Sequence, residues 1–288
     1  MSAVERFAAP RSLEEALEIL RAGEVTVLAG GTDLMPQSHS GKLPLARVLM
    51  SVRRVPELQG IAETEGTIRI GAATTIRELR ASSLVRGRLP ILWQACDRFA
   101  SDQVRNAATI GGNVCNASPA GDTLVPLLVL DAQVVLVSKP DGAMQVRRLP
   151  IAEFFLGPGR TRRRPGELLA AIEVPAPPAG FVSEFYKFGT RPALDISAIS
   201  IGFGAVRERG VLRAVRVALG AVAPTPIRAA RAEAALEGAA PDEQALAAAT
   251  AAALEAIHPI ADVRASDWYR RELVRNMLPR VVRRACED

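Results

Sequence analysis

Cysteine and histidine are scarce in this chain of 288 residues, and their scarcity argues against several kinds of site. The three cysteines, Cys96, Cys115 and Cys286, stand singly, which is typical of a reduced, cytoplasmic protein without structural disulfides. They are also too few for an iron–sulfur cluster held by this chain alone. The histidines, His39 and His258, form no known cluster with neighbouring metal ligands, so a zinc site is not expected either.

Aromatic residues make up only 4% of the chain, although its net charge of +5 would suit a nucleic-acid partner. A surface that stacks bases needs aromatic side chains, and the only basic run lies at residues 160–164. We therefore expect no nucleic-acid partner. Long apolar runs are missing too, so no membrane span is expected, and the first residues do not resemble a signal peptide.

The common nucleotide-binding and hydrolase motifs are absent as well. The triplet Gly202-Phe203-Gly204 begins like the fingerprint G-x-G-x-x-G but lacks its third glycine, and we interpret it as a β-hairpin. There is no Walker loop and no G-x-S-x-G nucleophile elbow. Because few acid–base side chains are available, the difficult chemistry is expected to belong to a cofactor.

Two glycine-rich stretches, each following an apolar run, are the most informative features present. Paired glycines allow positive φ and place no Cβ in the way of a ligand, so a row of main-chain N–H groups can hold phosphate. Two such stretches suggest one diphosphate bound from both sides, whereas a plain turn is the alternative for each. The stretches are Ala29-Gly30-Gly31-Thr32-Asp33-Leu34 and Thr109-Ile110-Gly111-Gly112-Asn113.

Apolar periodicity predicts strands and helices on both sides of a Pro-rich break at residues 175–180. Before the break, strands are expected at 25–28, 67–72, 133–138 and 168–174, and helices at 12–22, 75–80, 90–99 and 122–130. After it, strands are expected at 181–188, 200–207 and 211–222, and helices at 226–236, 242–256 and 266–286. The pattern predicts an α/β (α+β) protein with a domain boundary at the break.

Segments around the glycine stretches resemble the FAD-binding medium subunit of the molybdenum hydroxylases. This family includes the medium subunit of aerobic carbon monoxide dehydrogenase and the flavin domain of xanthine dehydrogenase. The segments that carry the resemblance are 29–37, 109–122, 164–169, 187–191, 195–197 and 220–228. Of these, 109–122 (TIGGNVCNASPAGD) is the most specific.

The resemblance implies a two-lobed FAD-binding domain of the vanillyl-alcohol-oxidase type, followed by a smaller α/β domain with a three-stranded sheet and helices. The expected domains are residues 1–176, with lobes of about 1–58 and 59–176, and residues 181–288. FAD would lie between the lobes, which explains why two separate glycine stretches occur.

The resemblance also assigns the cofactor-binding residues. Both glycine stretches would hold the diphosphate, Asn116 and Asp122 would bind polar parts of FAD, Phe99 and Leu169 would pack on it, and Lys187 would place a cation near the flavin. Structural alternatives remain: a turn for Asn116, a helix N-cap for Asp122, a core position for Phe99 and Leu169, and a surface position for Lys187. The full set is Ala29, Gly30, Gly31, Thr32, Asp33, Leu34, Phe99, Thr109, Gly111, Gly112, Asn113, Asn116, Asp122, Leu169 and Lys187.

The function that the resemblance implies is electron transfer through noncovalent FAD, with no catalytic base and no metal on this chain. A 2Fe-2S small subunit and a molybdopterin large subunit would be its partners, in a dimer of heterotrimers in the cytoplasm. The final acceptor stays open among NAD⁺, a quinone, oxygen and another carrier. A stand-alone FAD-dependent oxidoreductase is the alternative, followed by a non-catalytic nucleic-acid-binding or scaffold protein.

Overall fold

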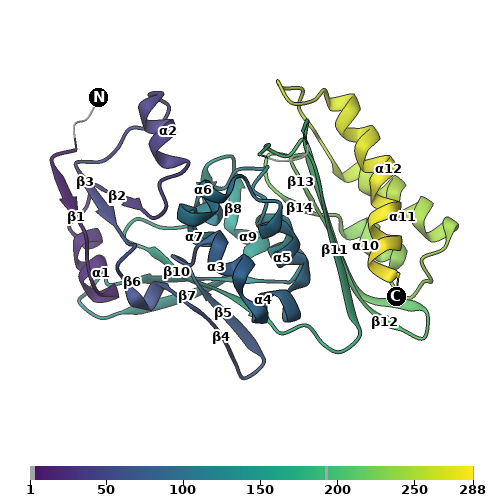
Figure 1. Cartoon of the computed structure of the whole chain (residues 1–288), viewed down its shortest axis with the longest axis horizontal. Helices are drawn as coiled ribbons and strands as arrows, with labels where there is room; N and C mark the ends of the chain where they lie inside the picture. Colours follow the sequence, from purple (N-terminus) through teal and green to yellow (C-terminus); the bar gives the residue numbers. More distant parts are fainter. Residues whose placement is uncertain (1–3, 192–193, 288) are drawn as a thin grey trace.

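The computed structural model describes residues 4–191 and 194–287, and its sheets form three regions arranged along the molecule (Figure 1). The first lobe contains a small parallel sheet, the second lobe a five-stranded sheet with helices, and the C-terminal region a four-stranded sheet with helices. This order confirms the expected two-lobed domain followed by a smaller α/β domain. Among the described residues, no helix is long and apolar enough to cross a membrane.

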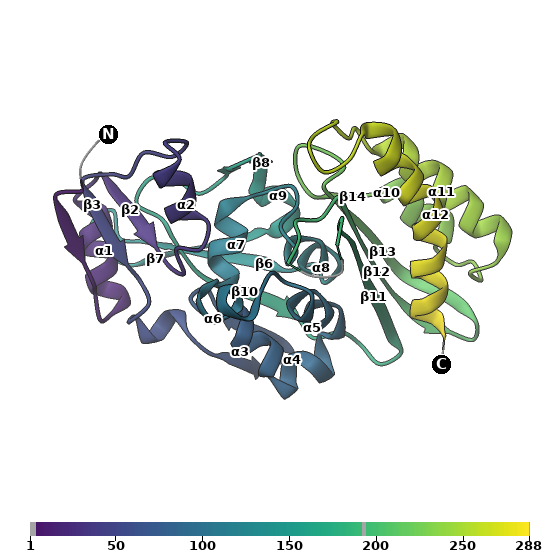
Figure 2. The ribbon, with the colours of Figure 1, turned by 45° about the horizontal axis from the view of Figure 1, so that its top comes forward.

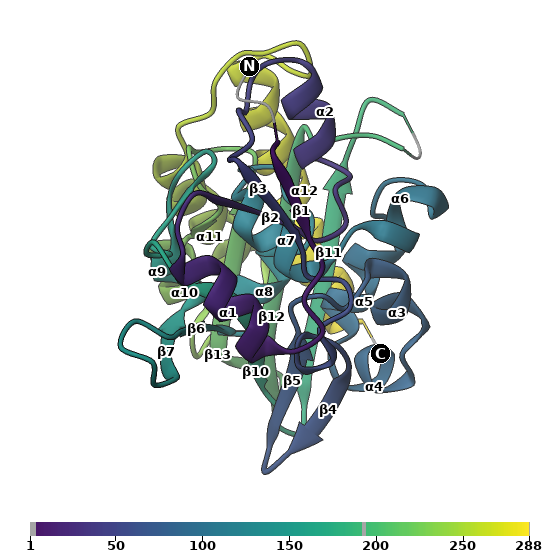
Figure 3. The ribbon, with the colours of Figure 1, turned by 90° about the vertical axis from the view of Figure 1, so that its left-hand side faces the viewer.

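The first lobe is a parallel sheet in the order β1-β3-β2, with helix α1 packed against it (Figure 3). Helix α1 begins after Ser12, whose hydroxyl accepts a hydrogen bond from the amide of Glu15, and it buries Ala16, Leu17 and Leu20. The elements are β1 (Arg6–Ala8), α1 (Leu13–Arg21), β2 (Val25–Leu28), α2 (Leu34–His39), β3 (Val48–Ser51) and a 3₁₀ turn (Pro56–Leu58).

The second lobe is an antiparallel sheet in the order β4-β5-β10-β6-β7. Its central strand β10 pairs with β5 and β6, so Ile172 lies opposite both Ile70 and Val134 in the largest apolar core. The strands are β4 (Ile61–Thr64), β5 (Thr67–Gly71), β6 (Gln133–Ser138), β7 (Gln145–Pro150) and β10 (Leu168–Pro175), with the separate pair β8 (Phe155–Gly157) and β9 (Arg160–Thr161). The helices are α3 (Ile76–Ala81), α4 (Ser83–Arg88), α5 (Pro90–Asp97), α6 (Asp102–Ala107), α7 (Ile110–Asn116), α8 (Leu124–Val129) and α9 (Ile151–Phe154).

The C-terminal region has one more strand than the sequence pattern predicted. Residues 227–228 form strand β14, which pairs with β13, so the expected helix from residue 226 begins only at Ala230. The expectation of three strands was therefore wrong, because β14 is defined by its pairing and not by a local pattern. The elements are β11 (Phe181–Phe188), β12 (Ile199–Glu208), β13 (Val211–Gly220), β14 (Ile227–Arg228), α10 (Ala230–Leu236), α11 (Glu243–Ala256) and α12 (Asp267–Cys286).

The four-stranded sheet is covered on both faces, by α10, α11 and α12 on one side and by α5 and α8 of the second lobe on the other (Figure 2). Gly202 and Gly204 allow this close approach, because an added Cβ would lie 2.7 Å from Val125 and 2.6 Å from Val129 respectively. Both glycines lie inside β12, which pairs antiparallel with β13 in the predicted β-hairpin. The two glycines also hold the C-terminal region against the second lobe.

Candidate functional site

A cavity of about 770 Å³ is lined by residues of both lobes and of the loop that follows β11. All predicted site residues except Lys187 line it. The volume lies within the range of roughly 300–1,000 Å³ that is usual for cofactor and ligand sites. The two glycine stretches, far apart in the sequence, thus contribute to one cavity.

The first glycine stretch connects β2 to α2, and its main-chain N–H groups make no hydrogen bonds within the described residues. The N–H groups of residues 30–34 donate to no acceptor within the described part of the chain. Gly31 has φ +72°, and a Cβ on Gly30 would lie 2.1 Å from the carbonyl oxygen of Ala107 in the second lobe. Glycine therefore lets the lobes approach each other here and leaves a row of free donors at the cavity.

The second glycine stretch differs from the prediction, because it forms the first turn of α7. Thr109 caps this helix by accepting a hydrogen bond from the amide of Gly112 at 3.0 Å. The amides of residues 110, 111 and 113 donate to the carbonyl oxygens of Thr74, Ala72 and Thr109. The expectation of positive φ and of free N–H groups was wrong for this stretch, which forms a closely packed wall instead.

Side chains supply most of the polar groups on this second wall. The Asn113 Oδ1 atom accepts hydrogen bonds from the amide and the hydroxyl of Thr123, which leaves its amide hydrogens available. Asn116 ends α7 and accepts a hydrogen bond of 3.4 Å from Gln37 of the first lobe. Gln37 also donates to the Asp33 carboxylate at 2.6 Å, so this chain of contacts links the lobes beside the cavity.

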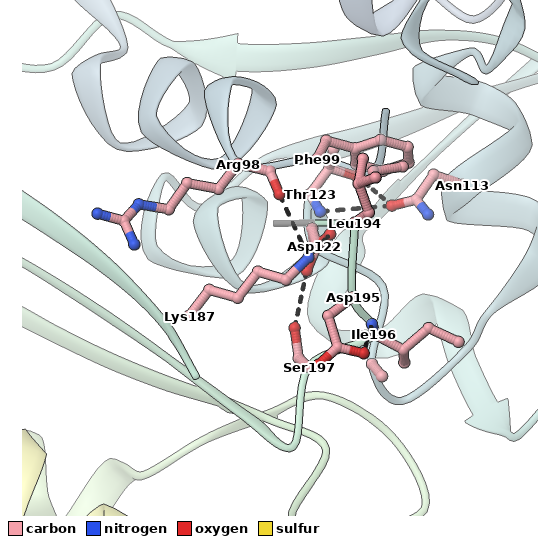
Figure 4. A network of polar contacts seen from close by, with 12 residues as sticks. Arg98, Phe99, Asn113, Asp122, Thr123, Lys187, Leu194, Asp195, Ile196 and Ser197 are labelled. Atoms are coloured by element: carbon pink, nitrogen blue, oxygen red, sulfur yellow. Dashed lines mark hydrogen bonds and ion pairs between the residues drawn. The ribbon is translucent and has the colours of Figure 1, made fainter. Parts of the chain in front are cut away.

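Asp122, Lys187 and Ser197 form a buried polar network between the second lobe and the C-terminal region (Figure 4). The Lys187 ammonium donates to Asp122 at 2.6 Å, and the Ser197 hydroxyl donates to the same carboxylate at 2.8 Å. Burial raises the pKa of Asp122, whereas Lys187 and Ser197 oppose that rise. Asp122 does not cap α8, so that alternative was wrong.

Lys187 is not the surface residue that the alternative interpretation described, since its side chain is only 7% exposed. It reaches the carbonyl oxygen of Arg98 as well as Asp122. Its charge is therefore largely offset by Asp122. Asp122 lines the cavity, whereas Lys187 does not. Phe99 and Leu169 are buried, as the core alternative stated, and they also line the cavity, where their contact with FAD stays a prediction.

Sequence reasoning missed several lining residues. Arg163 was noted only as part of a basic run, and Gln37 and Asp195 only as parts of segments that carry the resemblance. Asp195 and Ile196 follow β11 in the chain and reach the cavity from the C-terminal side (Figure 4). No local pattern marks these residues, because tertiary folding brings their loops to the cavity.

Comparison with known proteins decides between the classes of ligand that such a cavity could hold. Residues 3–177 match the family described as FAD binding domain in molybdopterin dehydrogenase, and residues 184–285 match the CO dehydrogenase flavoprotein C-terminal domain. The chain belongs to this FAD-binding family. It is an FAD-containing subunit of the oxidoreductase class typified by xanthine and CO dehydrogenases.

Curated relatives match this FAD-binding chain over almost its whole length. It is 35% identical to the xanthine dehydrogenase FAD-binding subunit of Escherichia coli O157:H7, over 95% of this chain and 93% of that one. It is 32% identical to the carbon monoxide dehydrogenase medium chain of Hydrogenophaga pseudoflava, over 97% and 96% of the two chains.

Solved structures give the same result. A chain of carbon monoxide dehydrogenase from Hydrogenophaga pseudoflava, in a form that lacks the Mo-pyranopterin moiety, superposes with a TM-score of 0.93 at 33% identity. A chain of quinoline 2-oxidoreductase from Pseudomonas putida 86 superposes with a TM-score of 0.90 at 28% identity. Each alignment covers 99% of this chain and 98% of the other.

The residues at the cavity fit FAD. The row of free N–H groups at residues 30–34 can bind a diphosphate, because such concave donor arrays bind anions. Phe99 and Leu169 provide apolar contact area, and Asn113 and Asp122 provide polar groups for hydroxyls. The cavity therefore offers each kind of contact that a dinucleotide with a planar ring system requires.

Proposed function

We propose that this chain is the electron-transfer subunit of a molybdenum hydroxylase complex and holds FAD noncovalently between its lobes. In this proposal, a large subunit carries molybdopterin, a small subunit carries 2Fe-2S clusters, and electrons leave this chain for an external acceptor. The complex would be a cytoplasmic dimer of heterotrimers. The single cavity lined by both glycine stretches is the observation that carries the proposal.

Each group at the cavity has a role in this proposal. The N–H groups of residues 30–34 bind the diphosphate, and Thr109, Asn113 and Asn116 bind polar atoms from the opposite wall. Asp122 accepts a hydrogen bond from a cofactor hydroxyl, and Lys187 fixes the position of that carboxylate. When bound, FAD supplies a ring that accepts single electrons and releases two, which joins one-electron donors to two-electron acceptors.

The acid–base content of the cavity supports electron transfer over a stand-alone oxidase. Its ionisable lining residues are Asp33, Asp122 and Asp195, together with Arg163 and Cys115. Asp33, Asp122 and Asp195 each accept hydrogen bonds from neighbouring side chains, at 2.6, 2.6 and 2.8 Å. Each of these carboxylates is held by a neighbouring side chain, and the described lining contains no imidazole, which disfavours a dedicated substrate base here.

We further propose that residues 1–176 and 181–288 are separate domains, with lobes of about 1–58 and 59–176 in the first. The sheets end and begin on either side of the Pro-rich break: β10 ends at Pro175 and β11 begins at Phe181. Limited proteolysis should therefore cut preferentially within residues 176–180. Cleavage elsewhere first would argue against this boundary.

Purification of the tagged full-length chain from its native source tests the proposed complex. The expected product contains FAD, molybdenum and iron in a fixed ratio together with two further chains, and the large and small chains carry the metals. The chain purified by itself should bind FAD but should not be reduced by the substrate that reduces the complex. A chain that purifies alone, with FAD but without molybdenum or iron, would contradict the electron-transfer role.

A further inference from the structure

Arg163 is the one cationic residue among the described residues that line the cavity. The acidic residues of the lining are three, Asp33, Asp122 and Asp195. Lys187 offsets Asp122 from outside the lining, and no ion pair neutralises Asp33 or Asp195 among the described residues. A diphosphate adds further negative charge to this surface, so electrostatic balance requires a cation.

The guanidinium of Arg163 is available for this role. Its Nη1 atom donates to the carbonyl oxygen of Glu167 at 2.9 Å, and no acid pairs with it in the described part of the chain. The two arginines of strand β7 differ, since Arg147 pairs with Glu167 at 2.7 Å and Arg148 with Glu173 at 2.8 Å. Arg163 thus has donors left over, on an exposed side chain at the rim of the cavity.

The loop that carries Arg163 lies against α7, beside the wall that lacks free main-chain donors. The amide of Gly159 donates to the carbonyl oxygen of Ala117, just after α7, at 3.3 Å. Burial raises the pKa of the Cys115 thiol on α7 to about 11, and the nearby charge of Arg163 acts in the opposite direction. The cation therefore lies close to the helix that forms the second wall.

We infer that the Arg163 side chain binds the diphosphate of FAD and replaces, on the second wall, the main-chain donors that the first wall provides. This inference rests on the proposed FAD site. Arginine suits the role because its planar donors bind phosphate oxygens in pairs and keep their charge at every physiological pH. The residue acts on binding of the ADP half of the cofactor and takes no part in electron transfer itself.

Titration calorimetry on the flavin-stripped full-length chain tests the inference, with FAD and ADP as the titrants. The variants are Arg163→Leu, Arg163→Lys and, as a matched control, Arg162→Leu. Arg162 is an exposed neighbour that donates to the carbonyl oxygen of Glu153 and does not line the cavity. Melting temperatures report whether each variant is folded.

Arg163→Leu should lower the affinity for FAD and for ADP about tenfold at low ionic strength, as expected for one charge-assisted contact at a partly exposed site. Arg163→Lys should recover part of the lost affinity, and Arg162→Leu should bind both ligands like wild type. Added salt should reduce the difference in affinity between wild type and Arg163→Leu. Unchanged affinity in Arg163→Leu would overturn the inference. The inference would also be overturned if Arg163→Lys lost as much affinity as Arg163→Leu and the loss did not depend on salt, since that outcome indicates a packing role. Failure of the wild-type chain to bind FAD would instead overturn the proposed function.

Discussion

At the scale of single residues, the buried pair of Lys187 and Asp122 controls the charge beside the proposed flavin site. A lone ammonium would favour reduced flavin, which carries negative charge. The pair is close to neutral as a unit, since the two groups are 2.6 Å apart and both side chains are at most 10% exposed. The influence of either residue on the flavin therefore depends on the other.

Lys187→Met should lower the flavin reduction potential, and the effect should grow as the pH rises. Without Lys187, the pKa of Asp122 loses an interaction that lowers it, so burial raises it further. Below that pKa the acid is neutral, and above it a lone carboxylate disfavours the reduced flavin. One unit charge about 4 Å from the reduced flavin would interact with it by on the order of 4 kcal/mol at an effective dielectric of about 20. Solvent will reduce this interaction strongly.

Potentiometric titration of the FAD-loaded variant at several pH values measures this shift. The double variant Lys187→Met/Asp122→Asn serves as the control, because it removes the titrating group and should show no additional pH dependence. If Lys187→Met binds FAD fully and keeps the wild-type potential at every pH, Lys187 has no electrostatic role at the flavin.

FAD should be released from the protein by acid precipitation, because Cys115, the one cysteine among the described residues of the lining, is a poor nucleophile. Burial raises the pKa of the Cys115 thiol to about 11, so it stays protonated at neutral pH, and the thiolate is the reactive form. The yellow colour should appear in the supernatant, with Cys115→Ala as a control that behaves in the same way. Flavin retained in the wild-type pellet and lost from that of Cys115→Ala would show a covalent bond instead.

At the scale of elements, the close approach of the first glycine stretch to α6 sets the distance between the lobes. Gly30→Ala should impair FAD binding and destabilise the fold by about 2 kcal/mol, because the new Cβ would overlap the backbone at Ala107. Gly87→Ala is the matched control: this glycine lies in α4 with open space around it, and alanine there should stabilise by about 0.5 kcal/mol. Urea unfolding and FAD titration of both variants give the comparison. Equal behaviour of the two variants would contradict the assigned contact.

The loop before α12 depends on a carboxylate with a lowered pKa. Burial opposes the shift, but the amides of Arg264 and Ala265 and the guanidinium of Arg270 hold the pKa of Asp262 at about 2. A lowered acid pKa stabilises the fold above the unfolded-state value of about 4 and loses that contribution as the pH falls towards about 2.

Asp262→Asn should therefore cost about 1 kcal/mol of unfolding free energy at neutral pH, after allowance for solvent screening. The gap between wild type and variant should close as the pH falls from about 4 to about 2. Denaturant unfolding at a series of pH values measures both curves. Parallel curves over this range would mean that Asp262 titrates normally.

Local signals predicted some elements closely and others poorly. Helices α1, α11 and α12 begin where expected because Ser12, Asp242 and Ser266 cap them through their own side chains. Helix α7 was not predicted, since its two glycines are weak helix formers. Its first turn is held by the carbonyl oxygens of Ala72 and Thr74, which only the tertiary fold brings there.

At the scale of the whole molecule, the resemblance gave the family and the two-lobed plan, and the glycine stretches located the cavity. The sequence does not predict which polar groups are hydrogen-bonded within the protein. The two stretches have similar sequences, yet the N–H groups of residues 30–34 are free and those of residues 110–113 donate to acceptors within the protein. Arg163 likewise reaches the cavity through a loop whose position depends on the packing of β9 against α7.

A crystal structure of the full-length chain loaded with FAD would show directly where the cofactor binds. We expect one FAD in the cavity between the lobes, with the diphosphate oxygens within hydrogen-bonding distance of the N–H groups of residues 30–34. Phe99 and Leu169 should contact the ring systems or the sugar chain of the cofactor. FAD bound anywhere else, or a diphosphate that makes no contact with residues 30–34, would contradict the account.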